Sequence, residues 1–133
     1  MGRRIDVTPG FCILWAFLLL TLPLRMLLAA AVAALVHEGC HWLAIRLTGG
    51  KVLGLTLGAG GMVMDTMPME PGKELVCALA GPVGSVLLVG VGRWMPLLAL
   101  CGLIQGMFNL LPLGTLDGGR VLSCAKTILR FQK

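Results

Sequence analysis

The sequence predicts an all-α polytopic membrane protein, with about four transmembrane helices, a short β-hairpin or re-entrant segment, and a C-terminal helix at the membrane interface. Two observations predict this fold class. The 133 residues are 57% hydrophobic and 13% charged, with a mean hydropathy of +0.92, which is too apolar for a soluble domain of this size. The apolar residues also fall into four segments, separated by glycine and proline. We expect a single membrane-embedded domain over residues 1–133.

The first two apolar segments are expected to form a helical hairpin. Residues 11–22 are a short apolar run, and Pro23 interrupts the run before residues 26–47 supply a full membrane span. Gly49 and Gly50 end the second helix, because glycine readily adopts the left-handed conformation that closes a helix.

The next segment changes to a period of two residues. Leu53, Leu55 and Leu57 alternate with glycine and threonine, and a glycine-containing turn at residues 59–61 precedes a second apolar run at residues 62–64. This pattern predicts a short β-hairpin. The strand at residues 52–57 is expected to have an unpaired edge, to which an unwound peptide could add as a further strand.

The third span is expected at residues 75–91, with a bend near Gly81 and Pro82. Small residues recur at intervals of four in this segment, which allows a neighbouring helix to approach closely. The pairs are Ala80/Gly84 and Gly81/Ser85.

The fourth apolar segment, residues 95–111, breaks at Pro112 into a glycine-rich stretch. Irregular backbone at membrane depth is tolerated only where it is buried in protein or lines a wet cavity. Residues 120–133 predict a basic amphipathic helix that lies at the membrane interface.

Basic residues predict a multi-pass orientation with both termini in the cytoplasm, most simply in a bacterial cytoplasmic membrane. In that orientation only Arg25 and Arg93 face outward, in accord with the positive-inside rule. Few aromatic residues accompany the basic ones, so lipid headgroups explain them better than nucleic acid does. Cleavage of a signal peptide near residues 29–31 is not expected, because it would remove most of the second helix. The inward-facing residues are Arg3, Arg4, Arg46, Lys51, Lys73, Arg120, Lys126, Arg130 and Lys133.

Both histidines lie in one five-residue run near the end of the second helix. His37 and His41 are four residues apart, about 40° around a helix, so one metal ion can reach both. Glu38 lies about 100° from His37 and about 60° from His41, which leaves it beside the metal and free to accept a proton from water. The spacing predicts both a binding and a catalytic geometry.

An acid near the bilayer centre costs about 2.5–3.5 kcal/mol, so such residues usually have a partner and a role. Glu38 and Asp117 are the two acids in apolar surroundings. A catalytic zinc takes three protein ligands, and His37, His41 and Asp117 supply that number and leave Glu38 as the base. Alternatively, Asp117 caps the tail helix or pairs with Arg120.

Four motifs occur along the chain in a fixed order: the two histidines with Glu38, then Ala80-Gly81-Pro82, then residues 109–112, then residues 116–119. In these motifs and their order, the chain resembles the site-2 protease family of intramembrane zinc metalloproteases. It looks closest to the small bacterial branch that includes sporulation factor-processing proteases. The resemblance implies zinc ligation by His37, His41 and Asp117, activation of water by Glu38, and a place near the site for Asn109. The chain departs from the family pattern at Gly39-Cys40, and a glycine there weakens the helix by roughly 1 kcal/mol relative to alanine.

The expected function is therefore hydrolysis of a peptide bond in or near the transmembrane segment of a membrane protein substrate. The expected partners are that substrate, the lipid bilayer and a regulatory membrane protein, without nucleic acid. Two other classes remain open: a non-catalytic relative that binds membrane partners, and a metal-binding permeation element. Glu38 argues against both, because neither binding nor permeation needs a base beside the ligands.

Overall fold

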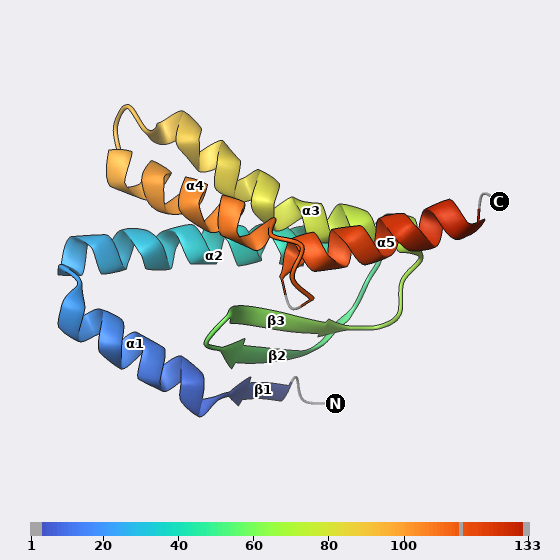
Figure 1. Cartoon of the computed structure of the whole chain (residues 1–133), viewed down its shortest axis with the longest axis horizontal. Helices are drawn as coiled ribbons and strands as arrows, with labels where there is room; N and C mark the ends of the chain where they lie inside the picture. Colours follow the sequence, from blue (N-terminus) through green and yellow to red (C-terminus); the bar gives the residue numbers. More distant parts are fainter. Residues whose placement is uncertain (1–3, 115, 132–133) are drawn as a thin grey trace.

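The computed structural model describes residues 4–114 and 116–131, and Arg3 and Lys133 of the orientation argument lie outside these ranges. The chain is mostly helical, with one small sheet that lies below every helix except the first, which runs beside it (Figure 1). The elements are β1 (Arg4–Val7), α1 (Pro9–Thr21), α2 (Leu24–Leu47), β2 (Val52–Gly58), β3 (Gly61–Thr66), α3 (Pro71–Leu87), the 3-10 helix η1 (Leu88–Val91), α4 (Pro96–Asn109) and α5 (Asp117–Phe131).

The predicted helical hairpin is present as α1 and α2. Two features start α1. The Thr8 hydroxyl accepts a hydrogen bond from the backbone N–H of Phe11, and Pro9, the first residue of the helix, has no N–H that would need a partner. The hairpin turns at Pro23, where the sequence predicted the break.

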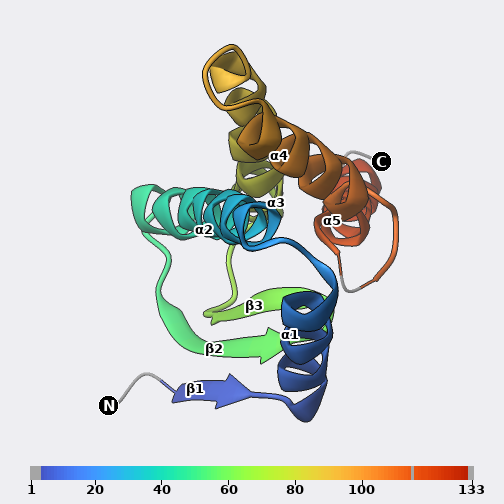
Figure 2. The same cartoon turned by 90° about the vertical axis from the view of Figure 1, so that its left-hand side faces the viewer.

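The predicted β-hairpin is also present, but its first strand is paired on both sides from Gly54 to Leu57. β1 pairs in parallel with β2, from Arg4 opposite Gly54 to Val7 opposite Leu57, and β3 pairs antiparallel with the other side of β2. The sheet order is β1-β2-β3. The prediction of an unpaired edge at residues 52–57 was wrong, because a strand some fifty residues upstream covers it. The outer strands are β1 and β3, and β3 lies nearer the helices (Figures 1 and 2).

Small residues bring the central helices together, as their spacing predicted. A Cβ atom added to Gly84 on α3 would overlap the Cys40 side chain of α2. At the next residue of α3, a Cβ atom added to Gly106 of α4 would lie 3.0 Å from the Cβ of Ser85. α3 therefore packs closely against both α2 and α4.

Within the described residues, two helical segments are long and apolar enough to cross a membrane, Leu24–Leu47 and Pro71–Val91. α1 and α4 are apolar but have only 13 and 14 residues, or roughly 20 Å of helix against a hydrocarbon core of about 30 Å. Many large apolar side chains on these helices are exposed. These features indicate a membrane protein, whereas four complete spans remain a prediction.

The C-terminal helix differs from expectation at its start. α5 begins at Asp117, not at Arg120, and its first turn and Cys124 are buried. α5 packs along α3, so it is part of the helical body as well as a candidate interfacial helix (Figure 1). This packing fixes the position of Asp117.

Candidate metal centre

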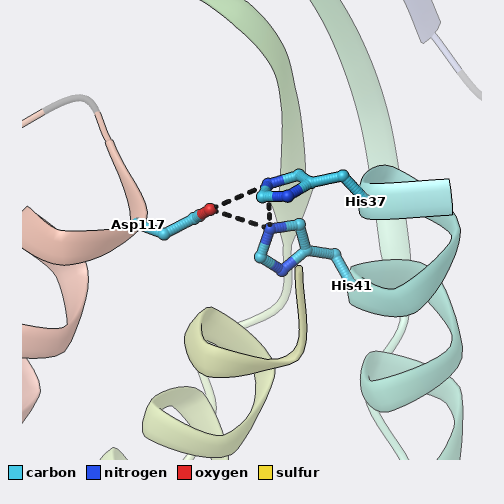
Figure 3. A group of neighbouring side chains, drawn as sticks. All are labelled: His37, His41 and Asp117. Carbon is cyan, nitrogen blue, oxygen red and sulfur yellow. Dashed lines mark hydrogen bonds and ion pairs between the residues drawn. The ribbon is translucent and has the colours of Figure 1, made fainter. Parts of the chain in front are cut away.

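The two histidines lie on the buried stripe of α2. His37 is 1% exposed and His41 is 7% exposed. Their spacing of four residues places both imidazoles on the face that packs against α3. Figure 3 shows the two rings projecting from α2 toward Asp117.

A tight loop after α4 delivers the third group. Asp117 opens α5, and the two glycines that follow let the first turn of α5 pack directly on the backbone of that loop. A Cβ atom on Gly118 would overlap the carbonyl oxygen of Leu110, and one on Gly119 would overlap that of Leu113. These contacts explain why the acid is followed by two glycines at this point.

The three side chains converge on one point. Oδ2 of Asp117 lies 3.0 Å from Nε2 of His37 and 3.0 Å from Nε2 of His41, and the two Nε2 atoms are 3.2 Å apart. Zinc–nitrogen bonds of about 2.0–2.1 Å in a tetrahedron separate the ligand atoms by about 3.3 Å. The observed spacings are within a few tenths of an ångström of that value, so the donor set fits a small tetrahedral cation such as zinc.

The hydrogen bond at Nδ1 of His41 further supports a metal site. Nδ1 of His41 donates to the backbone carbonyl of Cys77 at 2.7 Å, and a carbonyl can only accept. In a neutral imidazole Nε2 then carries a lone pair, and this lone pair faces the Asp117 carboxylate. A metal cation or a second proton must lie between two such acceptors.

The remaining predicted residues lie on a common cavity. Glu38 and Asn109 line a cavity of about 930 Å³ together with the three clustered side chains. The side-chain amide of Asn109 donates to the carbonyl of Gln105 at 3.1 Å, and in the described residues no hydrogen bond joins Asn109 to the histidines. The cavity wall is mainly apolar and comes from α1, α2, α4 and the strands β2 and β3.

The geometry gives no support to a pair between Asp117 and Arg120, whereas Asp117 does lie in the first turn of α5, where a carboxylate stabilises a helix. Among the described side chains, Asp117 forms ion pairs with the two histidines, whereas Arg120 pairs with Glu74 at 3.8 Å. The three-residue cluster is the group that could hold a metal ion in the described part of the chain.

Sequence reasoning missed the contribution of α3 to this site. Ser85 Oγ lies 2.8 Å from Nδ1 of His37, the Cys77 carbonyl holds His41, and a Cβ atom on Gly81 would overlap the ring of His41. The spacing of small residues was the available signal, and it was interpreted as packing alone.

Comparisons with known proteins point to the same class. No protein-family model and no curated protein matches the sequence. Among solved structures, the chain is similar to the site-2 protease from Methanocaldococcus jannaschii, with a TM-score of 0.67 and 26% sequence identity over 92% of this chain and 66% of that protein. The chain thus spans just under two thirds of that protein's length.

This likeness supports the site-2 protease family. The family is zinc-dependent in general, in agreement with the donor set at His37, His41 and Asp117. The likeness gives no support to the sporulation factor-processing branch, which rests on the sequence motifs alone.

Proposed function

We propose that this chain is a zinc metalloendopeptidase of the site-2 protease type, which hydrolyses a peptide bond in or near the transmembrane segment of a membrane protein. One observation carries the proposal: the ligand atoms of His37, His41 and Asp117 converge with the spacing of a tetrahedral metal site. Glu38 reaches the same apolar cavity, and neither partner binding nor permeation needs such a base.

Zinc held by these three residues would polarise the scissile carbonyl and lower the pKa of the attacking water. Glu38 accepts the proton that this water loses and later donates it to the amine nitrogen of the departing segment. Asn109 keeps one amide hydrogen beyond its bond to Gln105, and this hydrogen can be donated to the carbonyl oxygen as negative charge develops there.

We further propose that an unwound substrate segment adds to the outer edge of β3. The Leu57 carbonyl accepts from the backbone N–H of Thr8, so Leu57 directs its backbone groups toward β1. Met62 pairs with Leu57 and therefore directs its own N–H and C=O away from β2, as Met64 does two residues later. Met62 and Met64 line the same cavity as Glu38. A strand added there would carry its backbone past the proposed base.

The chain is proposed to cross a bacterial cytoplasmic membrane several times, with its termini in the cytoplasm. The pairing of β1 with β2 supports this orientation. It holds the strand before α1 and the strand after α2 in one sheet, so both strands lie on the same side of the membrane. The positive-inside rule assigns the basic residues on these connections to the cytoplasm. A regulatory membrane protein remains part of the proposal.

Cleavage of defined substrates tests the proposed function. The full chain in proteoliposomes is incubated with single-span model proteins that carry a proline within the span, because proline locally unwinds a helix. The products are identified by mass spectrometry. We expect cleavage in or beside the span, loss of cleavage with 1,10-phenanthroline, and recovery on addition of Zn²⁺. Cleavage that persists after complete removal of metal would contradict the proposal.

A further inference from the structure

A serine on the neighbouring helix holds the outer side of the His37 ring. Ser85 is 0% exposed and His37 is 1% exposed, and Ser85 Oγ lies 2.8 Å from Nδ1 of His37. Water cannot replace this hydroxyl without a change in the packing of α2 and α3. The Ser85 hydroxyl is therefore the contact of the His37 ring on the side away from Asp117.

We propose that Ser85 is a positioning residue for the metal centre. Its oxygen accepts the Nδ1 proton of His37, which leaves Nε2 of that ring unprotonated and directed toward Asp117. This inference rests on the proposed function, because the other tautomer of His37 needs no cation. If Ser85 donated to Nδ1, then Nε2 would carry the proton and would donate it directly to the Asp117 carboxylate.

The packing of α2 and α3 supports the assignment. His37 lies against Ser85, and one turn further along α2 His41 lies against Gly81, one turn back along α3. Each ring thus meets α3 at a matching level of the antiparallel helix pair. The Cys77 carbonyl already fixes the Nδ1 proton of His41, and Ser85 does for the first ligand what this carbonyl does for the second.

The serine is itself held in place from behind. A Cβ atom on Gly106 of α4 would lie 3.0 Å from Ser85 Cβ, and one on Gly102 would lie 2.9 Å from the Ser85 carbonyl oxygen. α4 therefore closes over Ser85 and limits its movement. A confined hydroxyl can define the direction of the imidazole more strictly than a mobile one.

Zinc affinity in Ser85→Ala tests the proposal without any measurement of activity. We expect the affinity of the full chain for Zn²⁺ to fall about 10- to 100-fold, the usual effect of removing the outer partner of a histidine ligand. Thr21→Val is the matched control, because the Thr21 hydroxyl donates to the carbonyl oxygen of Phe17 within its own helix, α1, away from the metal centre. This control should bind zinc as the wild type does.

Histidine ¹⁵N NMR of the same proteins separates positioning from a general loss of structure. In the wild type we expect both Nδ1 atoms to carry the proton, and in Ser85→Ala we expect the His37 signal to change while that of His41 is retained. Equal zinc affinity for Ser85→Ala and wild type, or a proton on Nε2 of His37 in the zinc-bound protein, would overturn the inference. If the wild type binds no zinc, the proposed function fails. In that case the inference about Ser85 is judged by the tautomer alone, and a proton on Nε2 of His37 overturns it as well.

Discussion

Replacing Gly81 with alanine should empty the metal centre, whereas the same replacement at Gly39 should leave it intact. Both glycines lie inside helices, and each gains about 1 kcal/mol of helix propensity as alanine. They differ in what the added methyl group meets. At Gly81 the new Cβ would overlap Nε2 of His41, and at Gly39 it would meet nothing within 4 Å.

The geometry sets the size of the effect. The Cβ of alanine at position 81 would lie 2.6 Å from Cδ2 and Cε1 of His41, which is about 0.8 Å short of the 3.4 Å at which ordinary contact begins. Because Nε2 of His41 would lie closer still, the imidazole or the whole of α3 must move by more than that amount, while metal sites tolerate about 0.2 Å in their bond distances. A displacement near 1 Å costs on the order of 100-fold in rate, and overpacking costs about 1–3 kcal/mol of stability.

The assay measures zinc per chain by elemental analysis, the thermal unfolding midpoint, and cleavage of a single-span model substrate, for wild type and both variants in the same detergent. We expect Gly81→Ala to lose most of its zinc and about 100-fold in cleavage rate. Gly39→Ala should keep its zinc and unfold at the same or a higher temperature. Full zinc content and near-wild-type cleavage in Gly81→Ala would refute the view that α3 fixes His41.

Three further variants test the third ligand and the proposed substrate edge of β3. Asp117→Ala should weaken zinc binding by more than the ~100-fold typical of losing an outer partner, and unchanged affinity by isothermal titration would remove Asp117 from the ligand set. Met64→Pro deletes an outward N–H on β3 and should slow cleavage and substrate crosslinking at unchanged zinc content. Val63→Pro instead breaks a bond to β2 and should lower the unfolding temperature, and equal behaviour of the two proline variants would exclude strand addition at β3.

Local patterns were sufficient to predict most of the helices and the three side chains that converge at the candidate metal site. Apolar runs ended by proline and glycine gave α1, α2 and α4 close to their bounds, because these residues act on the backbone within one turn. The convergence of Asp117 on the histidines followed from the cost of an unpaired acid in an apolar segment. That argument depends on chemistry and not on knowing the fold.

The features that the sequence did not reveal all depend on contacts between distant segments. β1 is four residues long and two of them are charged, so its own pattern is too weak to predict a strand, and it is ordered by pairing with β2. Ser85 and Gly81 belong to a stripe of small residues whose spacing is equally typical of packing alone. Only the register between α2 and α3 shows that this stripe meets the two imidazoles.

The central claim is that Glu38 is the base beside a zinc ion held by His37, His41 and Asp117. The most direct measurement is the single-turnover cleavage rate of Glu38→Gln at a zinc content equal to that of the wild type. Glutamine keeps the size of the side chain but cannot accept the proton, so we expect zinc to be retained and cleavage to be abolished. Substantial cleavage by zinc-loaded Glu38→Gln would contradict the account.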